Sequence, residues 1–219
     1  MTALTSTWQT FFSLDRPGKI VCVGKNYLDH VREMGGTAAA DEPILFMKPP
    51  SAVIGDGDAI LLPAMSSHVD YEGELVAVIG ATLHNADAAE ALRGVRGYCC
   101  GNDVTARDLQ AKDGQWTRAK GFDTFAALGP SLVSGVDPAD LHITTRVNGE
   151  TRQDSRTSLL IAPVGELLAF ISRVMTLEPG DAVYTGTPAG VGPLHEGDVV
   201  EVEIERVGVL RNPVRRAPS

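Results

Sequence analysis

Short apolar runs, separated by glycine, proline and polar residues, dominate the hydrophobic pattern of this chain. Runs of this length and composition predict β-strands rather than long helices. The expected strands cover residues 19–23, 44–47, 71–79, 97–102, 141–147, 182–185, 199–204 and 208–210. The run 141–147 continues into Asn148-Gly149, a dipeptide typical of the turn of a β-hairpin.

Helical periodicity is found in fewer places. Apolar residues recur at helical spacing in 26–34, which ends at a double glycine, and in a longer segment that begins at Pro163. Asp87 followed by Glu90 matches a capping box, so a short helix is expected to run to about Arg93. Strands and helices do not alternate regularly. We therefore predict a mixed α/β, β-rich fold with few short helices, and not a doubly wound one.

The length fits either one large domain or one domain with a small appendage. The chain has 219 residues, 43% of them hydrophobic, which is ample for a core. A short packed arm is expected at 1–17, with Trp8, Phe11 and Phe12, ahead of a main domain at 18–219. Several late arginines make the C-terminus locally basic, and we interpret this end as a solvated tail. They are Arg206, Arg211, Arg215 and Arg216.

Charge, cysteines and hydropathy exclude several classes of protein. The net charge of −9 argues against a nucleic-acid partner. Three cysteines, two of them adjacent and poorly placed to bridge, are typical of a reduced protein. Residues 1–14 lack the pattern of a signal peptide, and no apolar run approaches the ~20 residues of a membrane helix. We expect a soluble, cytoplasmic protein.

Two glutamates separated by one residue open the strand expected at 71–79. In a strand, Glu72 and Glu74 project from the same face, and the apolar residues after them indicate a strand covered on both sides. Two like charges there would lose hydration at considerable cost. A shared proton or a divalent cation would relieve it, and oxygen ligands favour Mg²⁺, Mn²⁺ or Ca²⁺. The alternative is an exposed strand end with solvated glutamates.

Asp103 would add a third carboxylate, since it follows the strand expected at 97–102. A helix cap for the segment that begins at Val104 explains the same residue equally well. His30 and Glu33 stand at i and i+3 of the helix expected at 26–34, so the carboxylate can orient the imidazole as a base. A surface pair is the alternative.

Other segments offer groups that bind anions. A double glycine and the alanine-rich residues 37–42, which we interpret as mobile, follow the predicted helix and are typical of a lid. The loop 185–193 could present backbone N–H groups to an anion, or be a plain turn. Cationic and amide side chains that could bind carboxylates or enolates are Lys48, Arg107, Gln110 and Lys120.

Taken together, these segments resemble the fumarylacetoacetate hydrolase family, in particular its small single-domain acylpyruvase and oxaloacetate-decarboxylase-like members. The matching stretches are VGKNYLDHVREM, LFMKPPSAVIG, DYEGELVAVIG, GNDVTARDLQ, WTRAKGFDTF, VNGE and GDAVYTGTPAGVGP. They span roughly residues 19–200 in the family's order. Tyr71, Gly73 and the stretch 125–130 are more similar to bacterial members of aromatic-degradation pathways, such as 2-hydroxyhepta-2,4-diene-1,7-dioate isomerase-like proteins.

The resemblance implies a β-roll of mixed sheets over 18–219, usually a homodimer, and a role for each matched residue. Glu72, Glu74 and Asp103 would bind Mg²⁺ or Mn²⁺, or Ca²⁺ in crystals. His30 with Glu33 would activate water from a lid that orders over the substrate. The residues implied to orient or contact the substrate are Lys48, Arg107, Gln110, Lys120 and Thr187. Thr187 would contact the carboxylate of the substrate.

The predicted reaction is hydrolysis of a C–C bond in a β-diketo acid, of the acylpyruvate or fumarylpyruvate type. His30 would take a proton from the attacking water, and Lys120 would stabilise negative charge. Oxaloacetate decarboxylation and isomerisation of a 2-hydroxy-dienoate at the same site are alternatives. A catalytically silent module that binds a metal or a dicarboxylate is a third.

Overall fold

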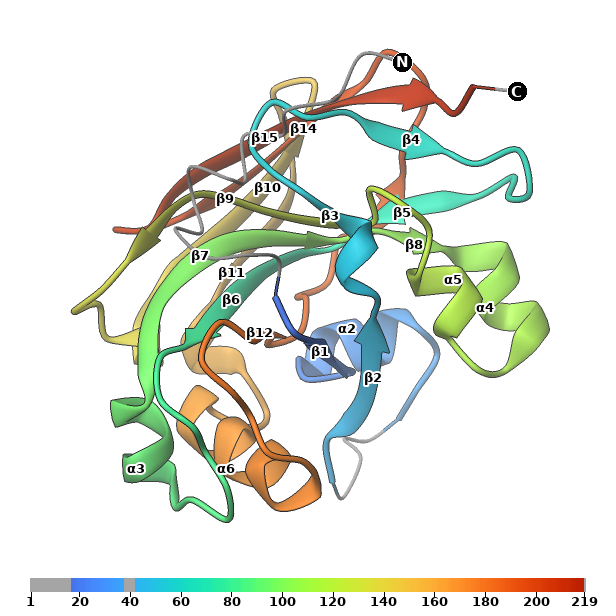
Figure 1. Ribbon diagram of the computed structural model, residues 1–219. Coiled ribbons are helices and arrows are strands. Elements are labelled where there is room, and N and C mark those ends of the chain that lie inside the picture. Colours follow the sequence, from blue (N-terminus) through green and yellow to red (C-terminus); the bar gives the residue numbers. More distant parts are fainter. Residues whose placement is uncertain (1–16, 38–41, 219) are drawn as a thin grey trace.

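The computed structural model describes residues 17–37 and 42–218. A seven-stranded mixed sheet, in the order β2-β1-β12-β6-β7-β9-β3, forms its centre. The strands are β1 Ile20–Gly24, β2 Ile44–Lys48, β3 Val53–Ile54, β6 Gly73–Ile79, β7 Val95–Asp103, β9 Ala126–Val133 and β12 Ala182–Tyr184. Figure 1 shows β6, β7 and β9 as long ribbons that curve together.

A five-stranded sheet, in the order β11-β10-β14-β15-β4, packs against this centre, with β15 over β9 and β14 over β7. Its strands are β4 Ile60–Leu62, β10 His142–Val147, β11 Glu150–Arg156, β14 Val199–Ile204 and β15 Gly208–Arg216. A small third sheet contains β13 Gly192–Pro193, β5 Val69–Tyr71 and β8 Thr105–Ala106. The predicted β-rich mixed fold is confirmed.

The helices are short and lie around the sheets. They are α2 Leu28–Glu33, α3 Ala88–Arg93, α4 Arg107–Asp113, α5 Thr117–Lys120 and α6 Val164–Val174, with single turns η1 Pro50–Ala52, η2 Pro138–Asp140 and η3 Thr157–Leu159. Helices α3 and α6 pack together at one end of the molecule (Figure 1). Within the described residues, no helix has the length and apolar character that crossing a bilayer requires.

The apolar run of β6 is explained by cover on both faces. Leu75, Ala77 and Ile79 belong to the larger hydrophobic cluster, whereas Val76 and Val78 belong to a second cluster on the other face. Burial on both faces requires such a continuous apolar run, as the sequence predicts. The three cysteines lie in the same sheet, on β1 and β7, and are free and buried.

The predictions that rest on a single turn or helix cap are confirmed. Asp87 and Glu90 form a reciprocal capping box on α3. Asn148 and Gly149, with φ of 54° and 81°, make the β10–β11 turn in the left-handed region that this dipeptide tolerates. Helix α2 ends before Gly35, whose φ is 81°.

Three expectations are wrong in detail. Residues 71–79 are not one strand, because β5 ends at Tyr71 and β6 begins at Gly73, which leaves Glu72 between the two strands. The basic C-terminus is not a tail, since β15 pairs with β14 and β4 up to Arg216. Asp103 caps no helix, because α4 begins at Arg107 with Ala106 as its N-cap. The expectations for the arm at 1–16 and for 38–41 fall outside the described residues.

Candidate metal centre and active site

Three carboxylates converge where β6 begins and β7 ends. Glu72, Glu74 and Asp103 each place an oxygen within 4.8 Å of the others. They are 4%, 1% and 1% exposed, so the alternative of solvated glutamates is wrong. The Asp103 amide donates to the Glu72 carbonyl at 2.8 Å, and this bond joins the two chain segments directly.

The break at Glu72 creates a tight elbow, which we define as Glu72–Glu74. A Cβ at Gly73 would lie 2.1 Å from Thr145 Oγ1 of β10, so only glycine fits between the sheets. The Glu72 amide is held by Asn102 Oδ1 at 2.9 Å. The two glutamates therefore converge through a fixed elbow, and not through the simple alternation of one strand.

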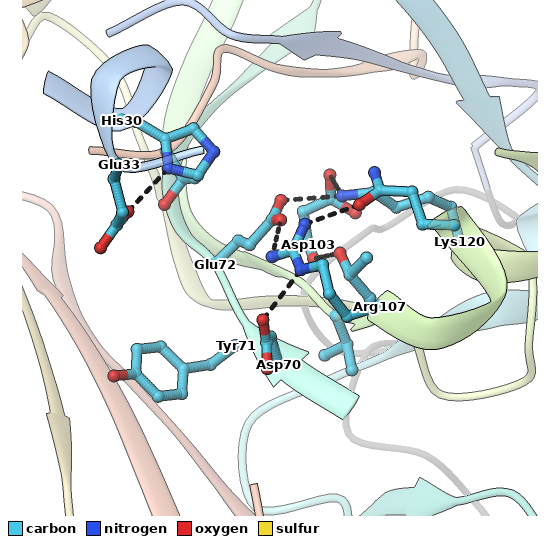
Figure 2. Close-up of polar contacts among 12 residues, drawn as sticks. His30, Glu33, Asp70, Tyr71, Glu72, Asp103, Arg107 and Lys120 are labelled. Atoms are coloured by element: carbon cyan, nitrogen blue, oxygen red, sulfur yellow. Dashed lines mark hydrogen bonds and ion pairs between the residues drawn. The ribbon is translucent and has the colours of Figure 1, made fainter. Parts of the chain in front are cut away.

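Buried cations surround the carboxylates (Figure 2). Lys120 Nζ lies 2.8 Å from Glu72 Oε2 and 2.7 Å from Asp103 Oδ2. Lys48 Nζ lies 2.7 Å from Asp103 Oδ1. Arg107 pairs with Glu72 at 2.7 Å and with Asp70 at 2.8 Å. Sequence reasoning considered only a proton or a dication as compensation, whereas protein cations already provide much of it.

The charges still fit a bound dication. The four carboxylates and three cations of this cluster leave one negative charge when all are ionised. A dication would make the sum positive and so attract an anionic substrate. The donor set is oxygen only, as Mg²⁺ and Mn²⁺ prefer.

Glu74 is the carboxylate with most to gain from an ion. Among the described residues it forms no ion pair, and its Oε2 accepts only from the Gly186 amide at 2.7 Å. Burial, together with the charges of Asp103 and Glu72, raises the pKa of Glu74 well above its usual value. Burial would also raise the pKa of Glu72, but Lys120 and Arg107 lower it below the usual range.

The predicted dyad is formed, and its imidazole lies beside the carboxylate trio. His30 Nδ1 lies 3.0 Å from Glu33 Oε2, and Glu33 Oε1 accepts from the Gly190 amide at 2.9 Å. His30 is buried and lines a cavity of about 140 Å³ together with the carboxylate trio. With Nδ1 engaged, Nε2 is the ring nitrogen available to water or substrate. Figure 2 shows the dyad on one side of Glu72 and the cations on the other.

The other predicted site residues divide into two groups. Arg107, Gln110, Lys120 and Thr187 line the cavity. Lys48 does not line it, and instead lies behind Asp103 with bonds to the carbonyls of residues 104 and 120. The Thr187 hydroxyl donates to the Gly73 carbonyl at 2.9 Å, so its proton is already engaged.

Sequence reasoning missed several residues of the site. Phe46 and Trp116 form one wall, with ring centroids 5.0 Å apart, and Lys25 stands at the cavity with a φ of 60°. Tyr71 donates to the Gly190 carbonyl at 2.8 Å, and Gln153 contacts both the elbow and the loop 185–193. Lys25, Phe46, Tyr71 and Trp116 lie inside the matching stretches, which assign them no role in the site, and Gln153 lies outside all of these stretches. The contacts of Tyr71 and Gln153 join segments far apart in sequence.

Comparisons with known proteins identify a family and several relatives for this chain. Residues 19–215 match the family model described as fumarylacetoacetate (FAA) hydrolase C-terminal. The mitochondrial oxaloacetate tautomerase FAHD2A of Bos taurus is 46% identical, over 91% of this chain and 67% of its own. The structure of 2-hydroxyhepta-2,4-diene-1,7-dioate isomerase from Mycobacterium marinum is 51% identical, with a TM-score of 0.86 over 93% of this chain and 77% of that one. Fumarylpyruvate hydrolase from Pseudomonas aeruginosa, solved with Mn²⁺ and pyruvate, is 35% identical, with a TM-score of 0.87 over 94% of both chains.

Proposed function

The chain belongs to the fumarylacetoacetate hydrolase family, and from this premise we propose that it is a divalent-metal-dependent hydrolase of short β-diketo acids. The observation that carries the proposal is the shared cavity, where the acidic trio and the imidazole of His30 meet. Mn²⁺ and pyruvate in the similar fumarylpyruvate hydrolase support both the ion and a 2-oxo acid ligand. The small cavity favours a short substrate.

In this proposal, Glu72, Glu74 and Asp103 hold Mg²⁺ or Mn²⁺. The bound ion would supply Lewis-acid stabilisation of negative charge that develops on the 2-oxo acid. Lys120 adds a fixed positive charge beside two of these carboxylates, since its charged partners Asp103 and Glu72 raise its pKa to about 12 against the effect of burial. With both carboxylates ionised, Lys120 is therefore a cation.

The dyad would activate the water. Glu33 holds the proton on Nδ1 of His30, so Nε2 can take a proton from water as the oxygen attacks the distal carbonyl. The C–C bond that breaks joins this carbonyl carbon to the carbon between the two carbonyl groups. Its electron pair stays with the 2-oxo acid fragment. That carbon then takes up a proton, and the products are a carboxylic acid and a shorter 2-oxo acid.

Keto–enol tautomerisation of oxaloacetate is a second candidate, favoured by the 46% identity to a relative of that name and by the small cavity. His30 would then move a proton between C3 and the C2 oxygen, and no water would be consumed. Isomerisation of a 2-hydroxy-dienoate would use the same proton transfer, and the isomerase-named structure supports it. Decarboxylation of oxaloacetate needs only the charge-stabilising groups.

A substrate panel separates these reactions. Acylpyruvates, fumarylpyruvate, oxaloacetate and 2-hydroxy-dienoates are incubated with protein, with EDTA or with added Mg²⁺ or Mn²⁺, and the products are identified. We expect metal-dependent release of a carboxylic acid from the β-diketo acids. Turnover of oxaloacetate or dienoates alone, or full activity in Glu33→Gln, would replace hydrolysis by the second candidates. No turnover despite Mn²⁺ binding would indicate a silent binding module.

We also propose a homodimer, as the resemblance implies, and light scattering of the purified protein tests it. A molar mass of one chain, 23.2 kDa, at the concentrations of the activity assay would contradict the dimer. The activity panel is independent of this outcome.

A further inference from the structure

Gln153 lies within β11, in the five-stranded sheet, and has no exposed surface. Its Oε1 accepts a hydrogen bond from the Gly73 amide at 2.9 Å. Its Nε2 donates at 2.8 Å both to Thr187 Oγ1 and to the Pro188 carbonyl. Because Gly73 supplies a donor and Pro188 an acceptor, only one orientation of the side-chain amide satisfies both.

The first contact fixes the elbow that carries two of the proposed ligands. The Gly73 amide is bound by Gln153, the Gly73 carbonyl by Thr187 Oγ1, and Thr145 blocks movement toward β10. Glu72 and Glu74 are the neighbours of Gly73 in the chain, so any shift of this residue moves both carboxylates. Gln153 thus holds the backbone between the two glutamates through the Gly73 amide.

The other two contacts fix the loop 185–193. Thr187 and Pro188 are held by Gln153, and two residues further on the Gly190 amide donates to Glu33. Gly190 also lies close to β11, since a Cβ there would lie 2.1 Å from the Arg152 carbonyl. One strand, β11, therefore supports both the elbow and the loop that contacts the dyad.

We propose that Gln153 is a positioning residue that couples the carboxylate trio to the loop 185–193 and thereby sets the affinity for the divalent ion. This inference rests on the proposed metal site. Like-charged carboxylates repel, and an elbow freed from Gln153 can relax to a wider separation. Residues behind metal ligands typically change affinity when they are replaced, because they fix the geometry of the ligands.

The test compares two buried side-chain amides, each of which hydrogen-bonds to the backbone of a distant segment. Asn212 on β15 is 1% exposed and donates to the carbonyls of Gly55 and Asp58, but it does not line the cavity of the trio. Gln153→Met and Asn212→Leu each remove the amide and keep the approximate size. Mn²⁺ affinity of the metal-free full chain is measured by EPR and calorimetry, and unfolding midpoints are recorded in parallel.

We expect both substitutions to lower the unfolding midpoint, and only Gln153→Met to raise the Kd for Mn²⁺, by about 10- to 100-fold. The EPR spectrum of bound Mn²⁺ should also broaden in that variant. An unchanged Kd in Gln153→Met, or an equal loss in Asn212→Leu, would overturn the proposal and leave Gln153 with a purely structural role.

If Gln153→Met does not fold, Gln153→Asn provides the test. Its amide is one methylene shorter, so it can reach the elbow or the loop but not both, and a weaker Mn²⁺ affinity is again expected. Wild-type affinity in Gln153→Asn would count against the coupling. The readout is Mn²⁺ binding alone, so the inference fails on the binding data, whereas the proposed hydrolase fails on the substrate panel.

Discussion

The carboxylate trio and the dyad differ in how the fold holds them. The trio is buried, lies at the ends of β6 and β7, and contacts cations from three other segments. The dyad lies on α2, a helix of six residues without a side-chain cap, and the Glu33 side chain is 32% exposed. A sheet that fixes charges and a short helix that presents a base should respond differently to substitution. Metal binding and proton transfer can therefore be disturbed one at a time.

Removal of the base is expected to have the largest effect on turnover. His30→Ala should lower kcat by about 10²- to 10⁴-fold, as is typical when a general base is lost. The Kd for Mn²⁺ should stay at the wild-type value, because His30 is not part of the trio. Steady-state kinetics at saturating Mn²⁺ and a Mn²⁺ titration measure the two quantities. A parallel loss of Mn²⁺ binding would show that the two regions are not independent.

Glu74→Gln tests the other region. The amide keeps the size and can still accept from Gly186, but it removes the carboxylate that has most to gain from an ion. Mn²⁺ affinity should fall by more than the roughly 100-fold limit usual for residues behind the ligands. Without metal, the variant should unfold at a higher temperature than wild type, since it lacks a carboxyl group whose ionisation is disfavoured by burial and by Asp103 and Glu72. A lower midpoint would contradict this.

Lys48→Met measures how much a buried cation beside the trio contributes to the free energy of unfolding. Burial lowers the pKa of Lys48 below its ordinary value, and the nearby charge of Asp103 offsets only part of this effect. Loss of one partner of a buried pair should lower the free energy of unfolding by about 3–5 kcal/mol, measured by denaturant titration. Arg118→Met, which removes an exposed pair with Asp113, is the control and should leave stability near wild type. Equal effects would contradict the distinction.

Tyr71→Phe is expected to have the smallest effect and to fall on the dyad. It removes the bond to the Gly190 carbonyl, while Gly190 still contacts Glu33. One hydrogen bond of this kind should change kcat by roughly 2- to 10-fold. Mn²⁺ affinity should not change, and a shift in Kd larger than that in kcat would place Tyr71 with the trio instead.

How far the sequence predicts the molecule depends on the range of the contacts. The capping box at Asp87 and the turn at Asn148-Gly149 are decided by neighbours in the chain, and both are confirmed. Strand β9 and helix α4 are not predicted. Gly129-Pro130 interrupts the apolar pattern of β9, and α4 has few apolar residues to show a helical period.

The site shows the same limit. Asp103 is expected at the end of a strand, and β7 places it there. The burial of Lys48 and its contact with Asp103, 55 positions later, depend on the tertiary fold, because three other strands separate β2 from β7 in the sheet. Neither segment alone indicates this contact. Gln153 is hidden for the same reason, because its partner Gly73 is 80 residues away and in another sheet.

The free thiols on β1 and β7 can report local opening of the sheet in which they lie. Cys22, Cys99 and Cys100 are buried in the sheet that carries Glu74 and Asp103, and burial raises the pKa of each thiol. An alkylating reagent needs an exposed thiolate, so it can react only when that sheet opens. The rate of thiol labelling thus counts openings of the seven-stranded sheet, without any introduced probe.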